Sequence, residues 1–123
     1  MQDFLISVVD DDEAGRESLA ALLGAAGFAV ALYGSGEEFL AAFDPALRGC
    51  VVLDVHLPGL TGLEVGAIVN QSARDFPIIF ISGRMNHIIR ARGADFGALA
   101  LAKPVPEGVL IAAIQRAVAG VGA

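Results

Sequence analysis

Residues 4–13, FLISVVDDDE, join a short apolar run to four consecutive acidic side chains, and this abrupt change is the most informative part of the sequence. Three later apolar runs also stop at a polar side chain: one at Asp54, one at the hydroxyl of Ser82 and one at Lys103, the only lysine. In an open parallel sheet, ligands bind where the carboxyl ends of the strands meet. The sequence therefore predicts one acidic pocket that also contains a hydroxyl and an ammonium group.

The four acidic residues are typical of a strand that ends in a metal site. Carboxylates crowded together at the end of a strand repel one another, and this repulsion is costly unless a proton or a cation relieves it. We therefore expect a cation at this end of the sheet.

The rest of the chain alternates apolar runs with segments of helical spacing. We expect strands at residues 4–9, 28–33, 51–53, 78–81 and 99–102. Helices are expected after each of them, the first ending at Gly27. Strands that alternate with helices predict an α/β fold with a doubly wound, five-stranded parallel sheet covered on both faces. The length suits one domain, expected over residues 1–119, with a flexible tail at residues 120–123.

Composition argues against two broad classes of function. The 123 residues carry a formal net charge of −6 with a pI near 4.6, which argues against direct nucleic-acid binding because such domains usually present a basic face. No apolar stretch approaches the roughly 20 residues that cross a bilayer, and the N-terminus lacks the basic start of a signal peptide. We therefore expect a cytoplasmic protein with no membrane partner. The single cysteine, Cys50, starts an apolar run and is expected to be a small core residue.

Four short motifs together resemble the receiver domain of two-component response regulators. They are VDD at residues 9–11, DVHLPGLTG at residues 54–62, ISG at residues 81–83 and KP at residues 103–104. The resemblance covers the whole chain, with the motifs in order and at nearly the usual spacings. It implies a flavodoxin-like (βα)5 fold with strand order 2-1-3-4-5.

The resemblance also implies a phosphoacceptor and a magnesium site. Asp54 corresponds to the carboxylate that takes a phosphoryl group from a sensor histidine kinase, a phosphotransfer protein or a small phosphodonor. Asp11 is expected to bind Mg2+ directly and Asp10 through water, with Asp54 and the backbone carbonyl of His56 as further ligands. Asp12 and Glu13, by contrast, are expected to cap the first helix.

The remaining reactive groups follow from the same resemblance. Lys103 is expected to pair with Asp54 and then with the phosphoryl group, and the Lys103–Pro104 peptide bond is expected to be cis. Ser82 is expected to donate a hydrogen bond to a phosphoryl oxygen. The protein would then be a phosphoacceptor that assists its own phosphorylation and dephosphorylation, and not an enzyme.

One position departs from the family pattern. Family members commonly carry Tyr or Phe three residues before the lysine, as a switch that moves when the strand-end hydroxyl is drawn to the phosphate. Here the residue is Ala100, and the segment from Ser82 to Lys103 is one residue shorter than usual. We still expect an output domain or a partner to contact residues 83–107, and a homodimer stays open.

Two other functions remain as alternatives. A degenerate receiver that acts as a constitutive interaction module shares the fold, but such a domain usually loses the acceptor, an acidic residue or the lysine. A haloacid-dehalogenase-like phosphatase also uses Mg2+ and an aspartate nucleophile, which lies in an Asp-x-Asp motif after the first strand. Here Asp10-Asp11-Asp12 stands at that place, without the threonine that usually follows.

Overall fold

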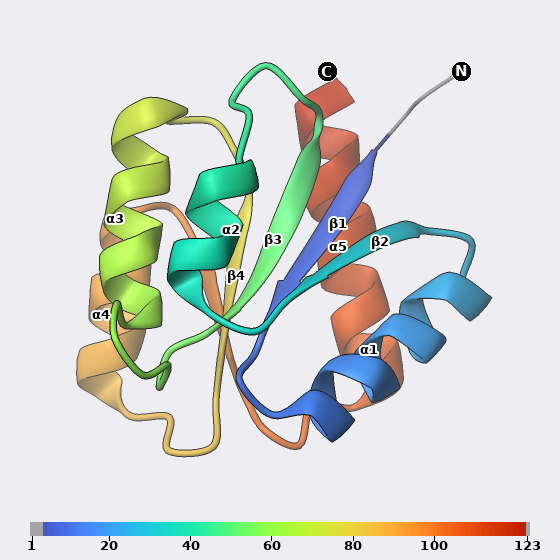
Figure 1. The fold of residues 1–123 in the computed structure, drawn as a ribbon, viewed down its shortest axis with the longest axis horizontal. Coiled ribbons are helices and arrows are strands. Elements are labelled where there is room, and N and C mark those ends of the chain that lie inside the picture. Colours follow the sequence, from blue (N-terminus) through green and yellow to red (C-terminus); the bar gives the residue numbers. More distant parts are fainter. Residues whose placement is uncertain (1–3, 123) are drawn as a thin grey trace.

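The computed structural model describes residues 4–122. Within this range, strands and helices alternate strictly, as the sequence predicts (Figure 1). In chain order the elements are β1 (Leu5–Val9), α1 (Glu13–Ala25), β2 (Ala29–Tyr33), α2 (Gly36–Ala42), β3 (Gly49–Asp54), α3 (Gly62–Ser72), β4 (Ile78–Ser82), α4 (His87–Asp95), β5 (Leu99–Ala102) and α5 (Glu107–Gly122).

The five strands form one parallel sheet in the order β2-β1-β3-β4-β5, which confirms the predicted fold class. The register places Val9 of β1 opposite Leu53 of β3, and Asp54 of β3 opposite Ile81 of β4. Because neighbouring strands run in the same direction, the loops that follow them all lie at one edge of the sheet, the lower edge in Figure 1. The polar strand ends expected to converge therefore do share one edge.

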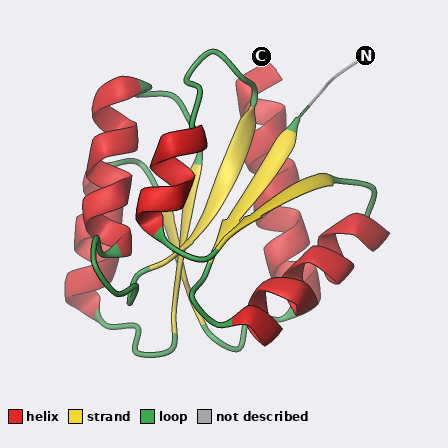
Figure 2. Ribbon diagram, in the orientation of Figure 1, coloured by secondary structure: helices red, strands yellow, loops and turns green. Residues whose placement is uncertain are grey.

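Helices cover both faces of the sheet. Figure 2 shows α1 and α5 on one face and α2, α3 and α4 on the other. Two apolar clusters fill the space between sheet and helices, and β3 and β4 are buried along their whole length. Burial on both faces explains why these strands read as continuous apolar runs and not as alternating ones.

Two glycines of α3 let this helix pack closely on the sheet. Glycine lowers helix propensity, so Gly66 on its own would weaken this helix. In the structure a Cβ at Gly66 would lie 2.6 Å from Cζ of Phe80, and one at Gly62 would overlap the backbone carbonyl oxygen of Asp54. Both glycines are therefore required by close contact, and Gly62 brings the start of α3 directly against Asp54.

The last helix is longer than the sequence suggests. Residues 120–122, expected to form a tail, belong to α5, which continues to Gly122, and Ala123 lies outside the described residues. A glycine lowers helix propensity without preventing a helix whose preceding turns are already packed. No helix between residues 4 and 122 has the length and apolar character needed to cross a membrane.

Candidate functional site: an acidic pocket at the ends of β1 and β3

Three carboxylates converge where β1 and β3 end. Asp10 and Asp11 directly follow β1, and Asp54 is the last residue of β3. One carboxylate oxygen from each lies within 4.8 Å of the others. Asp10 and Asp54 are 3% and 5% exposed, whereas Asp11 is exposed. Of the three candidate metal ligands, Asp10 and Asp54 are thus buried and Asp11 lies at the surface.

Lys103 joins the two buried carboxylates. Its Nζ donates hydrogen bonds to Oδ2 of Asp54 at 2.8 Å and to Oδ2 of Asp10 at 3.1 Å. Partial burial alone would lower the pKa of Lys103, but the hydrogen bonds and negative charges of Asp54 and Asp10 together raise the pKa above its ordinary value. The lysine therefore carries its charge at neutral pH. The Lys103–Pro104 peptide bond is cis, as the resemblance implies.

Backbone amides hold the other oxygens of the same two carboxylates. The N–H of Asp12 donates to Oδ1 of Asp10 at 3.0 Å, and the N–H of His56 donates to Oδ1 of Asp54 at 3.0 Å. Both carboxylates are thereby fixed in direction. Asp12 also caps α1 by accepting a hydrogen bond from the N–H of Gly15, which confirms its predicted role, and Glu13 lies in the first turn.

The charges of the pocket fit a divalent cation. Three carboxylates contribute three negative charges and Lys103 one positive charge, so two negative charges are not offset within the cluster. The donors are hard carboxylate oxygens, which suit Mg2+. The residues present therefore fit the expected metal, with Asp10, Asp11 and Asp54 as the side chains that would hold it. The side chain of His56 is exposed, and its backbone carbonyl stays a predicted ligand.

Ser82 lies beside the pocket but is bound to the following loop. It is fully buried at the end of β4, next to β5, and its backbone carbonyl accepts the N–H of Lys103 at 2.8 Å. Its Oγ accepts a hydrogen bond from the N–H of Arg84 at 3.0 Å. Rotation of this hydroxyl toward the pocket would break the contact with Arg84. Movement of Ser82 is thus linked to the loop between β4 and α4.

Ala100, which stands at the position of the family's aromatic residue, is almost fully buried in β5. Its backbone carbonyl accepts a hydrogen bond from Nη1 of Arg90, on α4, at 2.8 Å. Sequence reasoning did not find this contact. It ties α4 to the outer edge of β5 without an aromatic ring.

Two further residues near the pocket escaped sequence reasoning. Arg16 of α1 donates from Nη1 to the backbone carbonyl of Asp10 at 2.7 Å. Glu37 of α2 accepts the N–H of Leu60 at 3.1 Å and so holds the loop that follows Asp54. Both reach across from a neighbouring element, and their spacing along the chain gives no local signal of this.

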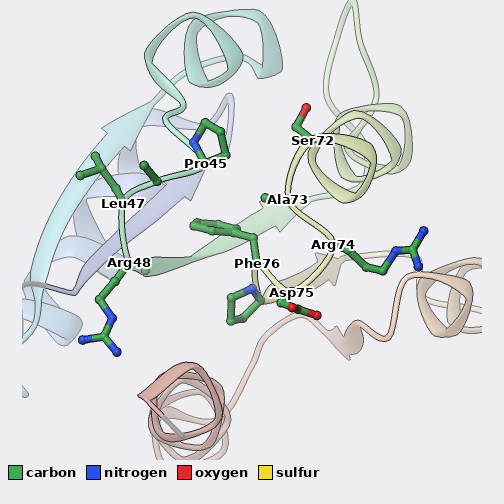
Figure 3. A pocket seen from close by; sticks show the side chains of 11 residues that line it. Pro45, Leu47, Arg48, Ser72, Ala73, Arg74, Asp75 and Phe76 are labelled. Carbon is green, nitrogen blue, oxygen red and sulfur yellow. The ribbon is translucent and has the colours of Figure 1, made fainter.

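A surface hollow of about 350 Å³ lies at the opposite end of the sheet, between residues 45–49 and 72–77 (Figure 3). In the figure the charged groups of Arg48 and Arg74 point away from its centre, which Phe76 occupies. A binding site needs polar groups that converge on a ligand. The hollow therefore gives no reason to place the function away from the acidic pocket.

Cys50 is buried in β3, as expected. Burial raises the pKa of its thiol to about 12, so the reactive thiolate is scarce at neutral pH.

A parallel sheet in this strand order, with an acidic pocket and a lysine at the strand ends, is the arrangement of a receiver. The chain belongs to this family: the model for the response regulator receiver domain matches residues 6–115. It is thus a receiver domain of the two-component type, and the match does not favour a phosphatase of the haloacid-dehalogenase kind.

Among curated proteins, the chain is 38% identical over 111 residues to the transcriptional regulatory protein FixJ of Azorhizobium caulinodans, covering 89% of this chain and 53% of the relative. It therefore spans about half the length of the curated relatives it matches. Among solved structures, FixJ-N is 36% identical with a TM-score of 0.85, covering 97% of this chain and 96% of that one. A response regulator from Burkholderia pseudomallei, solved with a phosphorylated aspartic acid, a calcium ion and citrate, is 26% identical with a TM-score of 0.83, covering 98% of this chain and 71% of that one.

Proposed function

We propose that this receiver accepts a phosphoryl group on Asp54 in a reaction that requires Mg2+. The observation that supports the proposal most is the position of Asp54, buried at the end of β3, in contact with Lys103 and within one carboxylate cluster with Asp10 and Asp11. The Burkholderia pseudomallei neighbour was solved with a phosphorylated aspartic acid and a calcium ion. A protein of this fold has therefore been solved with both a phosphorylated aspartic acid and a divalent cation.

The reaction is a displacement at phosphorus. An oxygen of Asp54 forms a bond to the phosphorus, and the bond from phosphorus to the donor breaks, its electron pair leaving with the donor nitrogen or oxygen. When bound, Mg2+ would offset the negative charge on the phosphoryl oxygens. Lys103, already paired with Oδ2 of Asp54, supplies a further positive charge beside the carboxylate.

Ser82 is proposed to bind the phosphoryl group once it is attached. Its hydroxyl is buried beside the pocket and now accepts the N–H of Arg84. An aspartyl phosphate adds negative charge and acceptor oxygens, which attract this hydroxyl. The loop after β4 would then lose one of its contacts and change position, and residues 83–107 would transmit the change to an output domain or a partner.

The phosphodonor is proposed to be a sensor histidine kinase or a phosphotransfer protein, with a cytoplasmic location as part of the same proposal. Family membership supports both. The chain would assist its own phosphorylation and dephosphorylation through Lys103 and the metal site. A transcriptional output is suggested by the name of the FixJ relatives, which are about twice as long as this chain.

Incubation with acetyl phosphate and Mg2+, followed by intact mass and phosphate release, tests this function. A receiver gains one phosphoryl adduct per chain and releases phosphate slowly. Rapid release of many equivalents would favour the phosphatase alternative. If the protein forms no phosphoryl adduct and also fails to bind beryllofluoride, a stable mimic of the phosphoryl group, the results would instead favour a degenerate receiver.

A further inference from the structure

We propose that Arg16 is a positioning residue that sets the direction of the Asp11 carboxylate in the metal site. This inference rests on the proposed function of the acidic pocket. Its basis is the 2.7 Å hydrogen bond from Nη1 of Arg16 to the backbone carbonyl oxygen of Asp10.

That carbonyl belongs to the peptide unit that joins Asp10 to Asp11. A peptide unit is planar and rigid, so a contact at its oxygen also fixes the nitrogen and Cα of the next residue. The other end of Asp10 is held as well, because its N–H donates to the backbone carbonyl of Tyr33 at 3.1 Å. Arg16 therefore fixes the plane from which the Asp11 side chain leaves the backbone.

Asp11 needs such support more than its neighbours do. Asp10 and Asp54 each accept one hydrogen bond from Lys103 and one from a backbone amide. Within residues 4–122, by contrast, no hydrogen bond or ion pair holds the exposed side chain of Asp11. Its direction toward the cluster depends on the two peptide units that flank it. The unit after Asp11 is held by the hydrogen bond from the N–H of Asp12 to Asp10, and the unit before it is held by Arg16.

The neighbouring loop leaves room for the guanidinium group. A Cβ at Gly34, between β2 and α2, would lie 3.3 Å from Nη1 of Arg16. An alanine there would press on the same nitrogen that binds the Asp10 carbonyl. The guanidinium would have to move by a few tenths of an ångström to make room for it.

A purely electrostatic role and a positioning role of Arg16 predict opposite changes in Mg2+ affinity when Arg16 is removed. If the guanidinium acted only as a nearby positive charge, its removal would strengthen the binding of a cation to the acidic cluster. If it positions Asp11, its removal weakens binding, and loss of a residue that orients a metal ligand typically lowers metal affinity by about 10–100-fold. The sign of the change therefore separates the two roles.

Calorimetric titration with Mg2+ provides the test, on the wild type, Arg16→Gln, Arg16→Lys and the control Arg92→Gln. Arg92 is exposed on α4, away from the pocket, and its replacement removes the same charge. We expect about tenfold weaker Mg2+ binding in Arg16→Gln, a smaller loss in Arg16→Lys, and no loss in Arg92→Gln. The Mg2+ concentration that gives half-maximal labelling by acetyl phosphate should rise in parallel, and excess Mg2+ should restore labelling.

Unchanged or tighter Mg2+ binding in Arg16→Gln would overturn the inference while leaving the proposed function intact. No Mg2+ binding by the wild type would instead overturn the metal site itself. If Arg16→Gln does not fold, Gly34→Ala serves in its place, because it keeps the arginine and displaces it. Weaker Mg2+ binding in Gly34→Ala supports the inference, and wild-type affinity contradicts it.

Discussion

Replacing Lys103 by methionine tests how far the Lys103 ammonium group stabilises the pocket when no Mg2+ is supplied. Its Nζ makes two hydrogen bonds to carboxylates, at 2.8 Å and 3.1 Å, and hydrogen bonds to charged groups contribute about 1.5–3 kcal/mol each. The Lys103 side chain is 33% exposed, so solvent screens part of this interaction. We therefore expect Lys103→Met to lower the free energy of unfolding by about 2–3 kcal/mol in the absence of Mg2+.

The pH dependence of this contribution follows from the raised pKa of Lys103. A folded-state pKa above the unfolded value of about 10.4 means that the stabilisation is complete below that pH. It is lost as the pH rises through the folded-state pKa. The difference between wild type and Lys103→Met should thus be constant near neutral pH and shrink only above about pH 10.

Magnesium should offset the stability that Lys103→Met loses. Without Lys103 the three carboxylates carry three negative charges and no positive one, so a divalent cation should stabilise Lys103→Met more than the wild type. Urea denaturation followed by circular dichroism, with EDTA and with saturating Mg2+, measures both effects. Lys103→Arg keeps the charge and should lose less stability than Lys103→Met. The free energy of unfolding of Arg92→Met should stay within about 0.5 kcal/mol of the wild-type value. Equal stability of Lys103→Met and wild type in EDTA would show that Lys103 does not stabilise the carboxylates. Equal stabilisation of both proteins by Mg2+ would show that the metal does not replace its charge.

Three other predictions concern the metal, the switch and the thiol. At a Mg2+ concentration 100 times its dissociation constant, wild-type folding should gain about 2.7 kcal/mol, and a melting temperature that does not respond to Mg2+ would rule out the site. Beryllofluoride should shift backbone amide signals across residues 83–97, with a larger response in Ala100→Tyr; shifts confined to residues near Asp54 would show that the Ser82–Arg84 contact transmits nothing. Because the Cys50 pKa is near 12, a thiol reagent should react at neutral pH only after unfolding, and rapid reaction of the native protein would contradict its burial.

The fold could be predicted because local and long-range signals agree in this sequence. The buried strands β3 and β4 read as continuous apolar runs, and the polar residues that end them mark the edge at which the strands converge. The same pattern located Asp54, Ser82 and Lys103. The strand order was predicted from the family resemblance, because apolar runs alone do not determine which strands are neighbours in the sheet.

The contacts that organise the pocket were not predictable in this way. Arg16 reaches the carbonyl of Asp10, and Arg90 reaches that of Ala100, through long side chains whose directions depend on packing. Gly66 illustrates the same limit. Its cost to the helix is visible in the sequence, whereas its benefit, the close approach of Phe80, appears only in three dimensions.

Peptide mapping after acetyl-phosphate labelling shows whether Asp54 is the residue that accepts the phosphoryl group. Asp54→Asn is nearly isosteric and removes the nucleophile. We expect one phosphoryl group in the wild type, located on the peptide that contains Asp54, and none in Asp54→Asn, with an unchanged circular dichroism spectrum. Labelling of Asp54→Asn at the wild-type level, or a phosphoryl group on Asp10 or Asp11 in the wild type, would show that Asp54 is not the acceptor.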